Sequence, residues 1–540
     1  MRRRLWLLLW VILVTVGVLS ACDGCRPAGT TTPNEAAAGE PPTARLFLLS
    51  DVAGALEPCG CVKDQLGGMD HFGALVAESR GKVKAFATVS AGPLFFMDAD
   101  LGPEKKAQEI AKAETIAKSL ESLGLAAFTP GRNEWAGGPE TLARLRDTCG
   151  APMLAANVQG AAGAVPWVVR DIGGFKLGVV GVAAPEKVDG VSSTAPIAAV
   201  KEAAAAARKG GAQAVVVSAA VGRGEAKRIA DEVPDLLAIV VGSTSTSGEV
   251  NTHASPAERI GEVLVVQPAN HLQTVAVLDL FVRDAKNGGP VKFADGTGID
   301  RIKKREELST RIDELREKIA TWENDKSVDA KDIAARKADL AKLETERDAL
   351  DKTPPPATGS FYRYAMRDIR ENLGADEKVK AQMLAYYKKV NDENKVAFAD
   401  KKPPAPPKGE PRYVGVEACT NCHEEPRKVW DQTKHAHAYE TLTKQFKEYN
   451  LDCVSCHVTG YDKPGGSTVT HVSDLKDVQC EVCHGPGEFH AAKPEKVHTL
   501  IPKPSADSCV SCHHPPHVHA FDAKAKMAEI LGPGHGKPAP

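Results

Sequence analysis

Apolar runs alternate with helical stretches from residue 44 to about residue 295, and this pattern predicts an α/β domain. The helical stretches include residues 104–124 and 195–211, and the second ends at a glycine pair, as a helix C-terminus should. The apolar runs are nearly continuous, which is typical of strands buried on both faces of a sheet. The last two runs have no helix between them, so we expect antiparallel strands to close the domain. The runs are residues 44–50, 83–90, 176–183, 212–220, 236–242, 262–269 and 274–283.

Residues 299–352 change to a charged sequence with a helical stripe of apolar positions, which predicts an antiparallel helical hairpin. The stripe is interrupted by the polar stretch ENDKSVDAKD. Two roles stay open: a spacer or homodimerisation arm, or a solvated helix pair packed on its own domain. The stripe comprises Leu308, Ile312, Leu315, Ile319, Trp322, Ile333, Leu340, Leu343 and Leu350.

The remaining boundaries follow from composition. Residues 353–411 contain a helical stretch and a proline-rich linker, residues 412–525 form a Cys/His-rich module, and residues 526–540 form a tail. At the other end, residues 22–43 are rich in Pro, Thr, Ala and Gly and indicate a flexible tether. We therefore expect a multidomain chain: an α/β domain over 44–298, the hairpin, and a mostly helical or irregular module.

The first 21 residues have the form of an export signal. A basic segment, Arg2 to Arg4, precedes an apolar segment too short to cross a bilayer comfortably. The sequence Leu-Ser-Ala-Cys22 resembles the lipobox of bacterial lipoproteins, which implies cleavage before Cys22 and acylation of its thiol. A plain signal peptide or a signal anchor are the alternatives. We expect an exported lipoprotein on the periplasmic face of a bacterial membrane, with the choice of inner or outer membrane open.

Composition adds one strong asymmetry. The formal net charge is −2, which gives no indication of a nucleic-acid partner. In contrast, 13 of the 16 histidines and eight of the 13 cysteines lie at or beyond Cys419. An ordinary protein core does not use these two residue types together, whereas metal and haem sites do.

Four Cys-x-x-Cys-His motifs account for those cysteines, and each is a c-type haem attachment signal. The two thiols bond covalently to the porphyrin, and the adjacent histidine becomes the proximal iron ligand. Zinc sites use paired Cys-x-x-Cys units and give no reason for a histidine after every second cysteine. We therefore expect four covalent haems and an electron-transfer role. The motif residues are Cys419, Cys422 and His423; Cys453, Cys456 and His457; Cys480, Cys483 and His484; and Cys509, Cys512 and His513.

The stretches YVGVEACTNCHEEPRKVWDQTKHAHA, DCVSCHVTGY and VQCEVCHGPGEFH are similar to the tetrahaem cytochrome c family, over about residues 413–522. The resemblance implies closely packed haems, most with two histidine ligands and one five-coordinate in the type member. It also implies that His435 and His490 are distal ligands. His437, His514, His517 and His519 are weaker candidates by the same resemblance.

His490 follows the third motif at a spacing that limits its reach. Six residues of extended chain span about 20 Å at most, and the Gly-Pro-Gly segment between His484 and His490 shortens that reach. We expect His490 to serve a neighbouring haem instead of the third, and the family resemblance indicates the first.

Residues 46–76 resemble the opening of the periplasmic 5′-nucleotidase metallophosphatases, which activate water with two metal ions. The metal-ligand motifs of that family are largely absent here. Asp51 remains, but the histidine two positions later is Ala53, and the expected Gly-Asp is Gly92-Pro93. Three later motifs also differ, at residues 131–134, 219–220 and 242–245, which read GRNE, AA and GSTS. We expect the fold to persist without the phosphatase chemistry.

Four cysteines remain after Cys22 and the haem thiols: Cys25, Cys59, Cys61 and Cys149. Cys59-Gly-Cys61 could form a redox-active pair or a soft-metal site. A pair of structural disulfides is the interpretation we favour in an exported protein.

These features lead to one principal hypothesis and two alternatives. The principal hypothesis is a membrane-anchored tetrahaem cytochrome that exchanges electrons with redox partner proteins, with the α/β domain as scaffold or docking surface. The first alternative is an oxidoreductase acting on a small nitrogen or sulfur compound at a five-coordinate haem. The second is a 5′-nucleotidase-like hydrolase.

Overall fold

The computed structural model describes residues 40–58, 65–244, 250–283, 288–323, 328–350, 356–496, 500–514, 518, 521–532 and 535. The expected signal peptide with Cys22 lies outside these residues, as do Cys25, Cys59, Cys61, His517 and His519. Within the described part of the chain, no helix has both the length and the hydrophobicity that crossing a membrane requires.

Two six-stranded mixed sheets form the centre of the α/β domain. The first sheet has the order β13 (Ala294–Asp295), β14 (Phe361–Asp368), β12 (Thr274–Phe281), β1 (Ala44–Ser50), β2 (Phe86–Ala91), β3 (Leu125–Thr129). The second has the order β10 (Ser255–Ile260), β11 (Val263–Gln267), β9 (Ala238–Gly242), β8 (Ala214–Ala220), β6 (Phe175–Ala183), β5 (Trp167–Ile172). A short ladder joins β4 (Val158–Gln159) to β7 (Ser192–Ser193).

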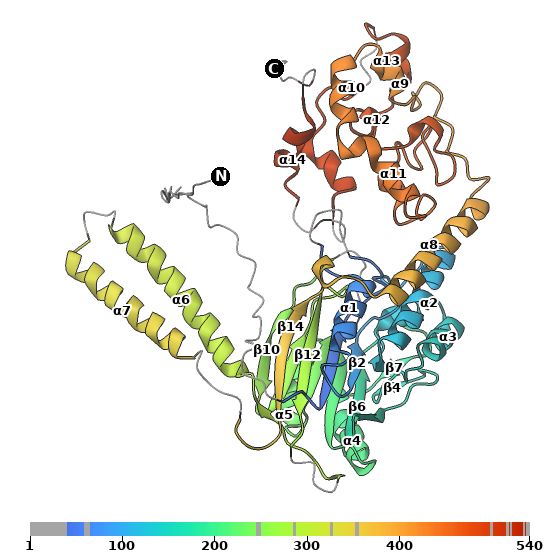
Figure 1. The fold of residues 1–540 in the computed structure, drawn as a ribbon. Coiled ribbons are helices and arrows are strands. Elements are labelled where there is room, and N and C mark those ends of the chain that lie inside the picture. The colour runs from blue at the N-terminus through green and yellow to red at the C-terminus, as the bar shows by residue number, and fades with distance from the viewer. Residues whose placement is uncertain are drawn as a thin grey trace, which may run out of the picture.

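Helices cover the outer faces of both sheets, which gives four layers (Figure 1). The first sheet is covered by α1 (Met69–Ser79), α2 (Lys106–Ser122), α3 (Pro139–Cys149) and α8 (Glu377–Ala397). The second is covered by α4 (Pro196–Lys209) and α5 (Arg223–Glu232).

The alternating side chains of β1 show why its sequence is continuously apolar. Phe47 and Leu49 pack under the helices of the first sheet, whereas Leu46 and Leu48 pack between the two sheets. All four are at most 1% exposed. A strand buried on both faces needs no polar alternation, so the expected α/β sandwich is confirmed.

The closing strands differ in part from the expectation. β12 is antiparallel to β1, as expected, but β11 is parallel to β9 in the other sheet. In addition, β14 pairs with β12 over all eight residues from Phe361 to Asp368. The α/β domain therefore extends beyond residue 298 and includes part of the segment that the sequence indicated as helix and linker.

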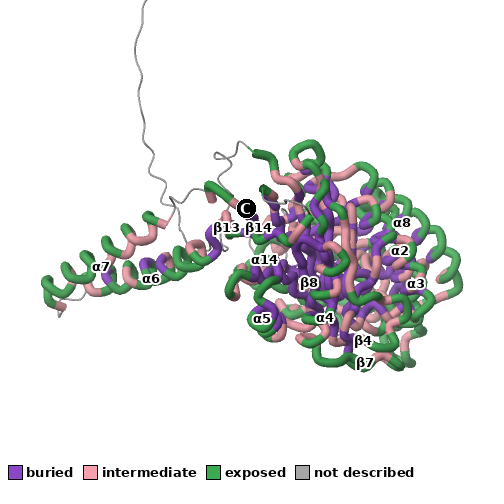
Figure 2. The backbone as a smooth tube through the Cα atoms, turned by 90° about the horizontal axis from the view of Figure 1, so that it is seen from below, coloured by how far each residue is buried: buried purple, intermediate pink, exposed green. Residues whose placement is uncertain are grey.

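The helical hairpin is an insertion between β13 and β14. It consists of α6 (Ile299–Glu323) and α7 (Ala330–Ala349), which pack together and extend away from the sheets (Figures 1 and 2). Leu308, Ile312 and Ile319 are buried on α6, whereas α7 has no fully buried residue. Ion pairs such as Lys304–Glu346, at 2.7 Å, link the two helices. The expected hairpin is confirmed.

The C-terminal module has short helices and a small core. Its largest group of buried apolar side chains contains six members, including Tyr439, Val454 and Val469. α14 extends past residue 525, so the module reaches into the segment expected to be a tail. The helices are α9 (Glu417–Thr420), α10 (Glu424–Asp431), α11 (Ala438–Thr443), α12 (Cys480–His484), α13 (Glu488–Ala492) and α14 (Ala523–Ile530).

Candidate functional site

Each Cys-x-x-Cys-His motif lies in or directly beside a single helical turn. The first lies at α9, the third forms α12, and the second and fourth lie at 3₁₀ turns spanning Val454–Cys456 and Ala506–Ser511. Residues three and four apart share one side of a helix. Both thiols and the histidine of a motif therefore lie on one side of the turn, as covalent attachment and axial ligation of one group require.

Backbone hydrogen bonds orient two of the four proximal imidazoles. His457 Nδ1 lies 2.6 Å from the Ala438 carbonyl oxygen, and His484 Nδ1 lies 2.7 Å from that of Ile501. A carbonyl only accepts, so Nδ1 carries the proton in both rings and Nε2 keeps a free lone pair. This is the usual way in which a protein fixes the tautomer of a metal-binding histidine.

Three proximal imidazoles face a second imidazole across a gap. The ring centroids of His423 and His490 are 6.4 Å apart, and so are those of His484 and His535. The centroid separation of His513 and His435 is 6.2 Å. Metal–nitrogen bonds of about 2.0 Å on both sides of one ion place two imidazole centroids roughly 6 Å apart. The spacing of all three pairs therefore fits an iron between the two rings.

Burial keeps three of these imidazoles in the form that binds a metal. Desolvation, with a smaller effect of His513, lowers the pKa of His435. Desolvation also lowers the pKa of His513, and that of His535 with added effects of His484 and His423. A neutral ring retains the lone pair that an iron ligand needs.

Glu481, between the two cysteines of the third motif, ties the first motif to the third. Its carboxylate accepts hydrogen bonds from the backbone N–H groups of Val414 (3.0 Å), Gly415 (2.8 Å) and Gly487 (2.7 Å). The first two residues lead into α9 and the third leads into α13, so this carboxylate helps to bring His423 and His490 together. Sequence analysis missed Glu481, because the middle positions of the motif have no fixed chemistry.

Thiols of different motifs meet, and these contacts give the order of the four sites. The Cys419 thiol lies close enough to Cys480 to lower the pKa of Cys480 to about 7. The Cys512 thiol likewise lies close to Cys456 and, with smaller effects of Ser455 and His514, lowers the pKa of Cys456 to about 6. Cys483 and Cys509 also lie close enough to influence each other. The sites therefore follow the order first, third, fourth, second.

The second motif differs from the other three. Among the described histidines, no imidazole ring faces that of His457. The weaker candidate His437 bonds elsewhere, with Nε2 3.1 Å from the Asp431 carbonyl oxygen. His514 lies close to Cys456, and His517 and His519 lie outside the described residues.

The distal assignments from sequence correspond to two of the three pairs. His490 faces His423 of the first motif and not His484 of its own, in agreement with the limited reach of the chain between them. The fourth motif pairs with His435. His535 was not singled out, because it lies in a Gly/Pro-rich tail with no motif around it.

The polar groups at the expected phosphatase site bond to the protein itself. Asp51 Oδ1, at the end of β1, accepts hydrogen bonds from the backbone N–H of Ser243 at 2.8 Å and from its hydroxyl at 3.0 Å. Glu134 accepts three backbone N–H groups, and Asn133 donates to two backbone carbonyls. Over the described residues, no group of three or more His, Cys, Asp or Glu side chains is arranged to hold a metal ion.

Cys149 corrects the expectation of two structural disulfides. Its thiol is free and buried at the end of α3, where it donates to the Arg146 carbonyl oxygen at 3.2 Å. Desolvation raises its pKa to about 11, so the unreactive thiol form is favoured. With Cys149 unpaired, the four remaining cysteines do not form two bridges among themselves.

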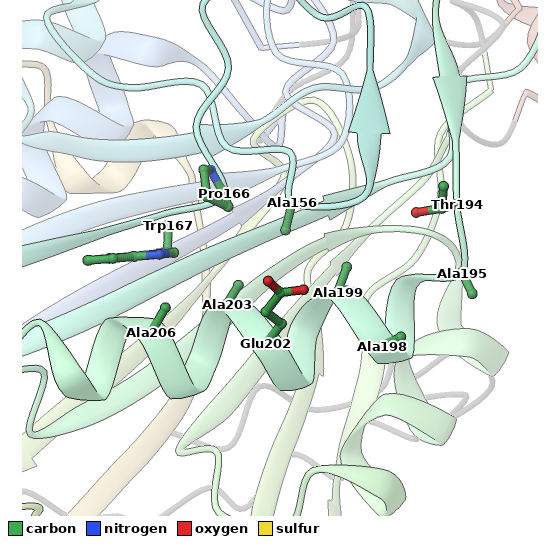
Figure 3. A pocket seen from close by; sticks show the side chains of 10 residues that line it. All are labelled: Ala156, Pro166, Trp167, Thr194, Ala195, Ala198, Ala199, Glu202, Ala203 and Ala206. Atoms are coloured by element: carbon green, nitrogen blue, oxygen red, sulfur yellow. The ribbon is translucent and has the colours of Figure 1, made fainter.

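A separate cavity of about 460 Å³ lies beside α4, at the end of the α/β domain remote from the C-terminal module (Figures 1 and 3). Trp167 and a row of alanines line it, and the Glu202 carboxylate points across it (Figure 3). None of the residues that sequence analysis singled out lies in this cavity.

Residues 418–485 match the family model described as cytochrome c554 and c-prime. Over 91 residues the chain is 34% identical to cytochrome c-554 of Nitrosomonas europaea, a match that covers 14% of this chain and 39% of that relative. The resemblance expected for the C-terminal module is thereby confirmed. The chain spans well under half the length of this curated relative.

Solved structures similar to this chain include a 5′-nucleotidase precursor from Thermus thermophilus, with a TM-score of 0.42 and 17% identity, covering 69% of this chain and 62% of that one. Another is the calcineurin-like phosphoesterase YfkN from Bacillus subtilis, with a TM-score of 0.38 and 17% identity, covering 46% of this chain and 88% of that one.

Proposed function

We propose that this chain is an exported, lipid-anchored c-type cytochrome that carries four haems and transfers electrons between redox partners. The observation that carries the proposal is the pairing of imidazoles. Three of the four motif histidines face a second imidazole at 6.2–6.4 Å between ring centroids. Two imidazole ligands leave no open position on an iron, so such haems suit electron transfer rather than substrate binding.

The residues would divide the work as follows. The eight motif cysteines would hold the haems covalently, and His423, His457, His484 and His513 would bind the irons on one side. His490, His535 and His435 would complete three of them. When bound, the haems supply reversible one-electron chemistry. The protein orients the ligands through Glu481 and the backbone carbonyls.

Haem content and spin state test this proposal. The purified full chain, produced with the cytochrome maturation machinery, is expected to show four covalent haems by mass spectrometry and a pyridine haemochrome assay. Its EPR spectrum should be dominated by low-spin signals. A chain that binds zinc and no haem would refute the proposal.

A second function is favoured by one observation, the lack of a facing imidazole at His457 among the described residues. An iron with one open position could bind or convert a small nitrogen or sulfur compound. Nitric oxide or carbon monoxide should then bind one haem in four. Four low-spin haems that bind neither gas would exclude this activity.

For the α/β domain we propose a role as scaffold without phosphatase activity. Asp51, Asn133 and Glu134 are engaged in hydrogen bonds within the protein, which supports this view. The full chain should contain no bound metal besides iron and should not hydrolyse nucleoside monophosphates with added Mn²⁺ or Zn²⁺. Hydrolysis that is abolished by Asp51→Asn would contradict the proposal.

Attachment to a membrane through acylated Cys22 is part of the same proposal. Cell fractionation should place the wild-type chain with membranes and the Cys22→Ala variant in the soluble periplasmic fraction. Equal membrane association of both variants would rule out the lipid anchor.

The helical hairpin offers a surface for a homodimer, which sedimentation of the soluble Cys22→Ala variant would detect.

A further inference from the structure

The segment that leads into the second motif is held by the α/β domain as well as by the core of its own module, in which Leu451 is buried. Lys447 Nζ lies 2.6 Å from both carboxylate oxygens of Glu57, in the loop after β1. Asn391 on α8 donates to Glu448 at 3.1 Å and accepts from the backbone N–H of Tyr449 at the same distance. The α/β domain thus contacts the chain in the six residues that precede Cys453.

Gln108 on α2 bridges this segment to α8. Its side-chain oxygen accepts from the Leu451 backbone N–H at 2.9 Å and from the Asn394 amide at 3.0 Å. Asn394 also donates to the Tyr449 carbonyl oxygen at 2.9 Å. Gln108 and Asn394 are both buried. Hydrogen-bonded buried amides favour one geometry, because a rearrangement would leave polar groups unpaired.

A cluster of charges completes the contact directly beside the haem-attachment residue Cys453. Lys112 Nζ bridges Glu109, at 2.9 Å, and Asp452, at 3.0 Å, and Lys105 Nζ lies 3.0 Å from the other oxygen of Asp452. The Lys112 side chain is only 12% exposed. Desolvation opposes ionisation of Asp452, but the attraction of Lys112 and Lys105 outweighs it and lowers the pKa of this carboxyl group. Asp452 is therefore charged at neutral pH.

We propose that Lys112, a residue of the α/β domain, is a positioning residue of the second haem site: with Asp452 it fixes Cys453 and tunes the reduction potential of that haem. The inference rests on the proposed function, since it requires a haem at Cys453 and Cys456. It gives the α/β domain a specific role, the electrostatic control of one terminal haem of the chain of four.

The two charges should act in opposite directions. Reduction adds one electron to the haem, so a nearby negative charge disfavours it and a nearby positive charge favours it. Lys112→Met removes a positive charge that partly neutralises the Asp452 carboxylate, so it should lower the reduction potential of the second haem. Asp452→Asn removes the negative charge that partly neutralises Lys112 and Lys105, so it should raise the reduction potential of the second haem.

Spectroelectrochemical titration of the full-length holoprotein provides the test. The potential of the second haem is assigned with a Cys453→Ala/Cys456→Ala variant, which lacks that haem. We expect the reduction potential of the second haem to shift in opposite directions in the two single variants. In the Lys112→Met/Asp452→Asn double variant, it should lie near the wild-type value. The other three potentials should stay unchanged. Lys118→Met, an exposed lysine on the same helix, is the matched control and should shift none.

Each outcome bears on the proposal. Shifts of both single variants in one direction, equal shifts of all four haems, or no shift would overturn it. If either single variant fails to incorporate the second haem, incorporation in the double variant, which removes the opposite charges of Lys112 and Asp452 together, supports the proposal and failure there overturns it. A wild-type chain without covalent haem would refute the proposed function itself, which is a different result from four haems that ignore Lys112.

Discussion

The α/β domain and the C-terminal module are stabilised in different ways. The domain has three large groups of buried apolar side chains, one between its sheets and one under each helical layer. Among its described residues, the module has a single group of six. A core that small gives little hydrophobic stabilisation. The domain can therefore fold through its own side chains, whereas we expect the module to depend on the haems proposed for its cysteines and histidines.

The largest expected effect is the loss of the module without haem. Expression of the full chain without the haem-attachment machinery should leave residues 412–535 open to proteolysis, while the α/β domain stays protected. Mass spectrometry of limited digests measures this. Equal resistance of both regions in the haem-free chain would contradict the comparison.

Phe47→Ala should have the next largest effect, confined to the other region. Phe47 is fully buried on β1, with its ring edge-to-face against Phe72 at 5.7 Å. Loss of a buried phenylalanine costs about 3–5 kcal/mol of unfolding free energy. Urea denaturation followed by circular dichroism measures the loss, and the haem absorption spectrum should not change. A changed haem absorption spectrum at low urea concentration would show that destabilising the α/β domain also disturbs the C-terminal module.

Asp51 offers a pH-dependent test within the α/β domain. Burial raises its pKa to about 6, against the lowering effect of hydrogen bonds from Ser243 and Ser50. The folded state then binds more protons than the unfolded state between about pH 4 and 6, so the contribution of Asp51 to stability falls as pH rises through this range. Asp51→Asn should therefore gain stability relative to wild type, by about 2–3 kcal/mol at pH 7 and close to zero at pH 4. Urea midpoints of both proteins at pH 4 and pH 7 measure this gain. The same stability difference at both pH values would contradict the raised pKa of Asp51.

Loss of one ion pair between the two helices of the hairpin should have the smallest effect. Lys304 and Glu346 form an ion pair with side chains 53% and 43% exposed. Exposed ion pairs contribute little to stability, because water screens the two charges. Lys304→Ala should shift neither the urea midpoint of the α/β domain nor the haem potentials beyond error. A large loss of stability would indicate that the hairpin belongs to the core of the α/β domain.

The sequence predicted those features that depend on short-range patterns. Continuous apolar runs identified the buried strands, and the Cys-x-x-Cys-His motifs led to a cytochrome c resemblance that the match over residues 418–485 confirms. The roles of the motif thiols and histidines stay predictions. His490 could be assigned to a neighbouring site because six residues of chain limit its reach.

The features it missed depend on contacts between distant segments. β14 reads FYRYAMRD, half polar because it lies near the edge of the first sheet, and nothing local shows that it pairs with β12. His535 faces His484 although the two are far apart in the sequence, and Lys112 meets Asp452 at a sequence separation of 340. Such pairings follow from tertiary packing, and no local pattern marks them.

Quantitative EPR of the fully oxidised, full-length holoprotein tests the central claim most directly. The imidazole pairs His423–His490, His484–His535 and His513–His435 predict three low-spin irons per chain. His457, which faces no imidazole among the described residues, predicts one high-spin iron. Fewer than three low-spin irons in a chain that carries four haems would contradict the assignment of these pairs as axial ligands.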